Sequence, residues 1–148
     1  MRAVPVRVAL LLAAIALAGF GLIRLSDHRA CERAGVDAYA FGLRQAGGLD
    51  ADNVLDALLD RCRGALKLSQ SSEAFGRGGR IDASERLARE AVRREPERWL
   101  SWLALSRAQE RRGELVDAQR SATRVRALNP RYGGQAPGVL PAGAAIAP

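Results

Sequence analysis

The sequence predicts an all-α protein in which an apolar amino-terminal transmembrane helix is followed by a short α-solenoid of stacked helix hairpins. Three observations predict this fold class. The chain opens with a long uncharged apolar run. Its 148 residues are 48% hydrophobic but only 5% aromatic, and they are rich in Ala and Leu, which favours helices over sheets. Gly and Pro also recur at a fixed spacing in the second half, which is typical of repeated helix pairs.

The apolar run defines the first segment, residues 1–25, as a transmembrane anchor or signal-anchor. No charge occurs from residue 8 to residue 23, and residues 4–25 as a whole are expected to contact the lipid bilayer. About 20 apolar residues span a bilayer, and flanking Arg7 and Arg24 can extend their charges to its two surfaces. A cleaved secretory signal is the alternative, since Ala16 and Ala18 form a small-x-small site. The apolar run continues past that site, which favours the uncleaved anchor.

The basic residues on the two sides of the apolar run are nearly balanced, so they leave the membrane orientation open. Arg2 and Arg7 precede the run, and three arginines follow it by residue 33. The short basic start resembles a signal-anchor, and we therefore expect a single-pass protein of the cell membrane with its bulk outside the cytoplasm. In an oxidising compartment Cys31 and Cys62 are a possible disulfide. Two buried thiols are the equal alternative, and the spacing of the two cysteines does not fit a metal site.

Residues 26–64 are predicted to be a helical region that can be interpreted as a degenerate helix pair. A helix from about residue 30 to 45 is broken at Gly47 and Gly48, and Asp50 is expected to cap the next helix. A third helix begins near residue 65 and ends at the glycines of residues 76–79. Asp82 and Glu85 have the spacing of a capping box that opens a helix to residue 94. Two further helices are expected at 97–111 and 114–128.

The second half of the chain is periodic. The separation between Gly79 and Gly113 is the same as that between Pro96 and Pro130. This equal spacing predicts repeated helix hairpins at 65–98 and 99–132, each of which must stack on a neighbour to bury its apolar face. A Gly/Pro/Ala-rich tail at 133–148 is expected to be disordered.

Both hairpins resemble the tetratricopeptide repeat, whose length of about 34 residues agrees with this spacing. The second hairpin has Trp102, Leu105, Gly113, Ala118, Ala122 and Pro130 at the family's W, L, G, A, small and P positions. The first one has Leu68, Phe75, Gly79, Ala88, Ala91 and Pro96 at corresponding positions. The chain departs from the pattern at Gln109 and Val125, and at Ser71, Ser72 and Ser84.

The resemblance implies a groove that is lined by the first helix of each pair and that receives another protein. The matching positions are Ser69, Glu73, Arg77, Leu103, Arg107, Glu110 and Arg111. The expected function is therefore a membrane-anchored, non-catalytic scaffold that holds a protein partner at the membrane. The alternative for the charged positions is ordinary solvated surface.

The arrangements of residues that catalysis or a cofactor would require are not found in the sequence. The single histidine, His28, has no carboxylate pair or cysteine beside it, and no phosphate-binding loop follows a strand. We therefore expect no enzyme activity, no cofactor and no metal. The net charge of +7 raises the alternative of a cytoplasm-facing module that binds nucleic acid. Interleaved pairs such as Glu85 and Arg89 count against it, and a cleaved, secreted repeat protein is a third possibility.

Overall fold

A computed structural model describes residues 3–43 and 47–132, with side chains from residue 8 onward. These residues form six α-helices and no β-strand, which confirms the predicted all-helical class. The helices are α1 (Ala3–Gly42), α2 (Ala51–Arg61), α3 (Ala65–Arg77), α4 (Ile81–Arg94), α5 (Trp99–Arg112) and α6 (Leu115–Leu128). The predicted disordered tail at 133–148 lies outside the described residues.

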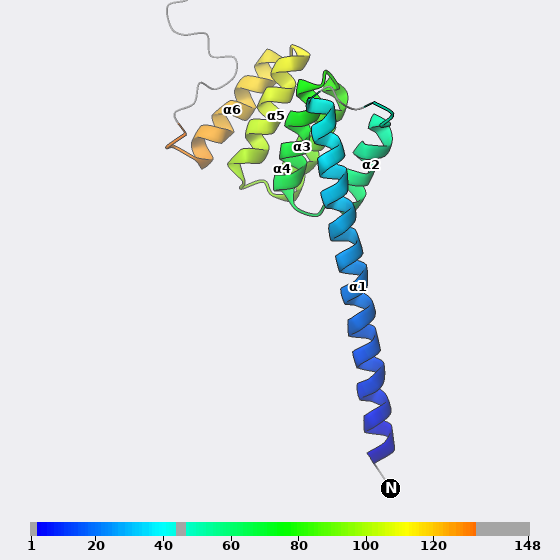
Figure 1. Ribbon diagram of the computed structural model, residues 1–148. Coiled ribbons are helices and arrows are strands. Elements are labelled where there is room, and N and C mark those ends of the chain that lie inside the picture. The colour runs from blue at the N-terminus through cyan, green and yellow to red at the C-terminus, as the bar shows by residue number, and fades with distance from the viewer. Residues whose placement is uncertain (1–2, 44–46, 133–148) are drawn as a thin grey trace, which may run out of the picture.

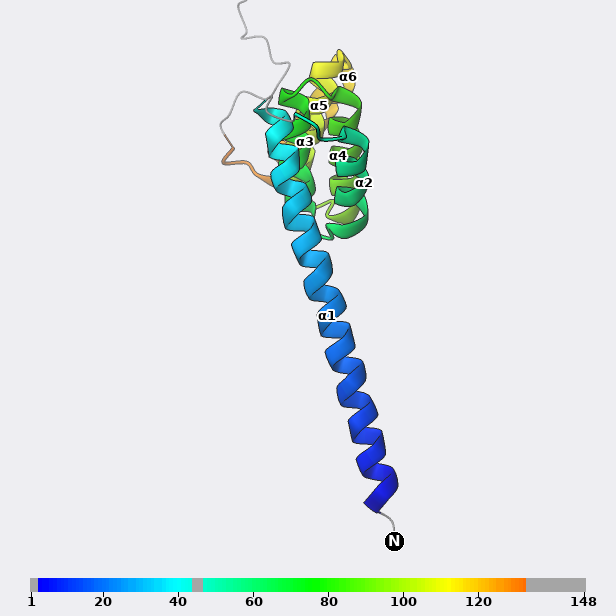
Figure 2. The ribbon, with the colours of Figure 1, turned by 45° about the vertical axis from the view of Figure 1, so that its right-hand side comes forward.

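Helix α1 is a continuous rod that joins two segments predicted from the sequence as separate elements. The expected anchor and the expected helix near residues 30–45 merge into one helix of 40 residues. The polar residues between Arg24 and Ala30 include neither Gly nor Pro, so nothing there interrupts the backbone hydrogen bonds. Figures 1 and 2 show the amino-terminal part of α1 projecting far beyond the other helices. This helix is long and apolar enough to cross a membrane, and its most apolar window is entirely exposed.

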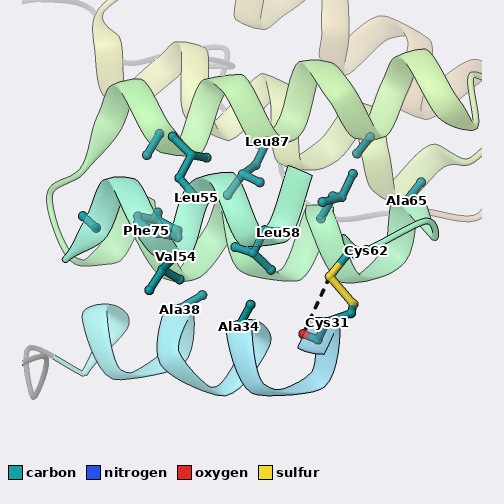
Figure 3. Packing of buried hydrophobic residues seen from close by; sticks show 14 residues of the cluster. Cys31, Ala34, Ala38, Val54, Leu55, Leu58, Cys62, Ala65, Phe75 and Leu87 are labelled. Carbon is teal, nitrogen blue, oxygen red and sulfur yellow. Dashed lines mark hydrogen bonds between the residues drawn. A yellow bond between two sulfur atoms is a disulfide. The ribbon is translucent and has the colours of Figure 1, made fainter. Parts of the chain in front are cut away.

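The other end of α1 belongs to the folded domain. It packs against α2 and α3, α3 packs in turn against α4 and α5, and α5 packs against α4 and α6 (Figure 1). The principal core lies among the first four helices and includes the fully buried side chains of Leu58, Leu68, Phe75 and Leu87 (Figure 3). The folded domain therefore begins within the same helix that carries the apolar segment.

A disulfide joins Cys31 of α1 to Cys62 at the end of α2. The sulfur atoms are 2.10 Å apart and the two Cα atoms are 4.9 Å apart. Both cysteines are buried at the end of the core from which α1 leaves the domain, as Figure 3 shows beside Ala65. The bridge therefore holds the first helix hairpin closed at the point where the rod emerges.

The sequence predicted side-chain caps at the starts of α2 and α4, and the structure has only the first of them. The predicted cap is confirmed at Asp50, whose carboxylate accepts a hydrogen bond of 2.9 Å from the Asp52 amide. The predicted capping box of Asp82 and Glu85 is wrong. Helix α4 starts at Ile81, two residues earlier than a cap at Asp82 implies. It has no side-chain cap, and the Glu85 carboxylate is buried in an ion-pair network instead. Gly79 and Gly113 adopt positive φ values of 81° and 86° in the turns within the last two hairpins.

A side-chain hydrogen bond recurs at equivalent positions of these two hairpins. Ser72 donates to the carbonyl of Ser84 at 2.7 Å, and Ser106 donates to the carbonyl of Ala118 at 2.9 Å. Buried hydroxyls need such partners, which explains why serine is accepted at positions where the resemblance leads one to expect apolar or small residues.

A second equivalent pair has changed its chemistry between the hairpins. Phe75 and Leu87 belong to the apolar core of the first hairpin. The equivalent residues of the second hairpin are Gln109 and Ser121, whose side chains form a buried hydrogen bond of 2.8 Å. One contact between paired helices is thus apolar in the first copy and polar in the second, and the departure at Gln109 is compensated by its partner.

Removal of the disulfide should destabilise the folded domain. The bridge closes a chain segment with a sequence separation of 31, for which loop-closure entropy predicts a loss of about 3–4 kcal/mol in the free energy of unfolding. We expect this loss for the Cys31→Ala/Cys62→Ala variant in chemical denaturation of the full chain in micelles. A reductant should lower the stability of the wild type to a similar extent and leave the variant unchanged. Equal stability of wild type and variant would contradict the prediction.

Candidate functional site

A groove runs between α3 and α5 on the face formed by the first helix of each of the last two hairpins. Its volume is about 140 Å³. The lining residues are Leu66, Ser69, Gln70, Glu73, Leu100, Leu103, Ala104 and Arg107. Leucine and alanine side chains thus line the groove together with a few polar groups, a composition that suits binding of an amphipathic segment.

Four of the seven residues predicted from the sequence line this groove. They are Ser69, Glu73, Leu103 and Arg107. Ser69 and Leu103 are buried, at 4% and 7% exposure, so they form the floor and offer little surface of their own. The Ser69 hydroxyl is already bound to the carbonyl of Ala65 at 2.8 Å.

The other three predicted residues, Arg77, Glu110 and Arg111, do not line the α3–α5 groove. Arg77 lies over the ring of Tyr39 in α1, 5.6 Å from its centre. Glu110 is exposed on α5. Arg111 forms an ion pair of 3.0 Å with Glu73, so it flanks the groove through its partner.

Glu73 of α3 forms ion pairs with two arginines of α5 at the groove. Its two carboxylate oxygens lie 3.4 Å from Arg107 and 3.0 Å from Arg111, both on the facing helix. The Arg111 guanidinium also covers Gly76, where a Cβ atom would clash with it. Gly76 lies inside α3, although the sequence pattern predicted that the helix ends before it. The network fixes the spacing between α3 and α5.

The sequence prediction missed the part of this surface that α1 contributes. A second hollow of about 330 Å³ lies between α1 and α3, lined by Gly35, Val36, Tyr39, Lys67, Gln70 and Ser71. Val36 and Tyr39 are 69% and 53% exposed although they are apolar or aromatic. Gln70 lines both hollows, so they adjoin along α3. The exposure of the Val36 and Tyr39 side chains could not be predicted from the sequence, because these residues lie in a region with no clear repeat pattern.

The residues that carry the family resemblance are mostly internal. Those buried in the structure are Leu68, Phe75, Ala88, Ala91, Leu105, Ala118 and Ala122. Trp102 is half-buried and its indole N–H donates to the carbonyl of Pro96 at 2.7 Å. Pro96 and Pro130 lie beyond the ends of α4 and α6. Trp99 packs against Tyr132, with ring centres 5.0 Å apart.

Arginine side chains tie the ends of neighbouring helices together. Arg94 of α4 donates to the carbonyls of Leu59 and Cys62 at the end of α2, where a helix leaves its last carbonyls without partners of its own. Glu90 holds Arg94 in place through an ion pair of 2.6 Å. At the same end of the domain the Glu95 carboxylate accepts a hydrogen bond of 3.0 Å from the first amide of α3, at Ala65.

The carboxylates in these networks have lowered pKa values. Hydrogen bonds from Arg93 and then Arg94 lower the pKa of Glu90 from 4.5 to about 2. Burial by itself raises the pKa of Glu85, but hydrogen bonds from Arg89 and Arg112 outweigh it and the net shift is downward. These groups are therefore ionised near neutral pH and serve to link helices.

Among the described residues, no group of three or more His, Cys, Asp or Glu side chains is placed to hold a metal ion. Neither the known protein families, nor the curated proteins, nor the solved structures contain a match to this chain.

The stability of the domain should fall in acid because the pKa of Glu90 is lower in the folded than in the unfolded state. Its contribution is complete above about pH 4.5 and is lost as the pH falls toward about 2. We expect Glu90→Gln to be less stable than the wild type at pH 7 and to approach it near pH 2, as measured by denaturation at each pH. Glu110→Gln, which alters an exposed carboxylate outside these networks, is the control. A constant difference at every pH would contradict the prediction.

Proposed function

We propose that this chain is a single-pass membrane protein whose helical domain is a short tetratricopeptide-like solenoid that binds a segment of another protein. The observation that carries this proposal is the α3–α5 groove together with the adjoining hollow between α1 and α3. The three helices present apolar side chains, including Val36, Leu66 and Leu100, on adjoining surfaces. The function is to hold a partner at the membrane, where tethering raises its effective concentration.

Packing supports the repeat arrangement. Helices α1, α3 and α5 lie in succession against one another, and each also packs against the helix that follows it. The recurring hydrogen bonds of Ser72 and Ser106 have the same separation as the repeated Gly and Pro residues of the sequence. In such an array the residues 26–64 supply the first helix pair, in which the end of α1 acts as the first helix.

The disulfide supports an orientation with the domain outside the cytoplasm. Disulfides persist in oxidising compartments and are rare in the cytosol. The apolar run ends at Ile23, and the bond between Cys31 and Cys62 begins only about two helical turns further along α1. The whole domain would then lie on the oxidising side.

The nucleic-acid alternative is disfavoured by the pairing of the arginines. Many of them bind carboxylates within the domain: Arg89, Arg93, Arg94, Arg98, Arg107, Arg111, Arg112, Arg120 and Arg124. Their charge is largely compensated locally, whereas phosphate binding requires uncompensated clusters.

A photo-crosslinking residue in the groove should trap the partner in cells. Leu66 is 40% exposed at the groove, so p-benzoylphenylalanine at this position can face a bound segment without disturbing the core. We expect a discrete crosslinked product from position 66 and none from Gln119, which is exposed on α6. Loss of the product when Leu100→Asp is added would tie it to the groove. Equal products from both positions, or a product that contains only this chain, would contradict a dedicated partner site.

The orientation can be measured with a membrane-impermeant thiol reagent on intact cells. With an outward-facing, bridged domain, Cys62 should be labelled only after reduction. Protection of Cys62 until the cells are lysed would place the domain in the cytoplasm. A mature chain that lacks residues 1–18 by mass would instead show that the apolar segment is a cleaved signal.

A further inference from the structure

A third hollow lies where α1 leaves the folded domain, and it adjoins the α3–α5 groove at Leu66 and Gln70. Its volume is about 520 Å³. Its lining combines basic, acidic and apolar residues: Arg24, Asp27, His28, Cys31, Glu32, Arg61, Arg63, Gly64, Leu66, Lys67 and Gln70. Four cationic side chains thus meet two carboxylates, and an apolar wall of Leu66 and the disulfide lies beside them. We call this feature the basal hollow.

The positive charge in the basal hollow is only partly compensated. Arg61 and Arg63 share the single carboxylate of Asp27, at 3.0 and 3.9 Å. Their side chains are 55% and 70% exposed, so most of their donors point to solvent. Lys67 forms an ion pair of 2.9 Å with Glu32, whereas the guanidinium of Arg24 lies over the aromatic ring of Phe20. An arginine pair of this kind can grip a phosphate oxygen with several donors.

The height of the basal hollow along α1 matches a membrane surface. The uncharged residues 8–23 of the helix are about 24 Å long. Residues 4–7, whose Arg7 can extend its charge to the membrane surface, bring the segment to about 30 Å, roughly the thickness of the hydrocarbon core. Arg24 then lies at its edge. Asp27, which holds Arg61 and Arg63, is about 4.5 Å further along the helix axis. The headgroup layer extends roughly 5–7 Å beyond the hydrocarbon core. With the apolar segment in a bilayer, the two arginines would lie level with the lipid phosphates.

We propose that the basal hollow binds the headgroup of an anionic phospholipid, with Arg61 and Arg63 on the phosphate and Arg24 at the edge of the acyl region. This inference rests on the proposed membrane anchor. The contact seats the base of the domain on the bilayer surface. Because α1 and the disulfide join that base to the rest of the domain, headgroup binding also sets the direction in which the partner groove faces.

The test is a lipid titration of the full chain in detergent micelles, with bound lipid counted by native mass spectrometry. We expect tighter binding of phosphatidylglycerol than of phosphatidylcholine. Each arginine at an anionic surface strengthens binding about five-fold, so Arg61→Gln/Arg63→Gln should bind phosphatidylglycerol about 25-fold more weakly. The control is Arg80→Gln/Arg86→Gln, the same charge change at two exposed arginines at the start of α4, which should leave binding unchanged.

If the Arg61→Gln/Arg63→Gln variant does not fold, lipid binding can still be measured for a single variant and at several salt concentrations. Arg24→Gln leaves the ion pairs of Arg61, Arg63 and Lys67 intact and should weaken binding about five-fold. Raising the salt concentration should weaken binding to the wild type. Equal affinity for the two lipids, or an equal loss in the Arg80→Gln/Arg86→Gln control, would overturn the proposal. So would displacement of the lipid by inorganic phosphate or by single-stranded DNA beyond the effect of sodium chloride at the same ionic strength, because the site would then not be one for a lipid headgroup.

A separate experiment tests whether the apolar segment of α1 anchors the chain in the membrane. Carbonate extraction of cells that produce the wild-type chain shows whether it stays in the membrane fraction at full mass. A full-length membrane protein without a preference for phosphatidylglycerol refutes only the basal hollow. A soluble or shortened chain refutes the anchor and, with it, the membrane position on which the headgroup assignment depends.

Discussion

The continuity of α1 is the constraint on which the rest of the structure depends. One helix carries the apolar segment and also forms the first wall of the domain, and the Cys31–Cys62 bridge fastens α2 to it where it emerges. Sharp bends in helices occur mainly at Gly, Pro or a bulge, and residues 24–34, where α1 leaves the domain, contain neither Gly nor Pro. The domain is therefore attached to the rod without a flexible linker, so its distance from the proposed bilayer and its rotation about α1 follow from the helix itself.

Charged side chains in this protein serve mainly to link neighbouring helices through ion pairs and hydrogen bonds. Glu90 holds Arg94 over the end of α2, Glu85 binds Arg112 between α4 and α5, and Glu73 links α3 to α5. These contacts join helices that are adjacent in the stack, whereas many surface ion pairs contribute little because solvent screens both partners. A strongly basic composition thus coexists with a surface on which much of the charge is compensated. The basal hollow brings four cationic side chains together with only two carboxylates.

The candidate groove could be predicted only in part from the sequence. Four of the residues that the repeat pattern predicts, Ser69, Glu73, Leu103 and Arg107, line the groove on facing helices. The pattern missed Val36 and Tyr39, because α1 has no recognisable repeat signature, and it included Arg111, which binds Glu73 instead of lining the groove. The capping box at Asp82 failed for a related reason. Local spacing does not reveal that Glu85 is recruited by Arg112, which is distant in the sequence.

The sequence by itself determined the helical class, the apolar segment, most helix boundaries and the Asp50 cap. These features depend on local composition, on breakers such as Gly and Pro, and on contacts within a few residues. Only the tertiary structure decided that the anchor and the first domain helix are one rod, that the cysteines are bridged, and where the exposed apolar and basic surfaces meet. Those outcomes depend on side chains brought together from distant parts of the chain, and the same residue pattern is compatible with several packings until the helices stack.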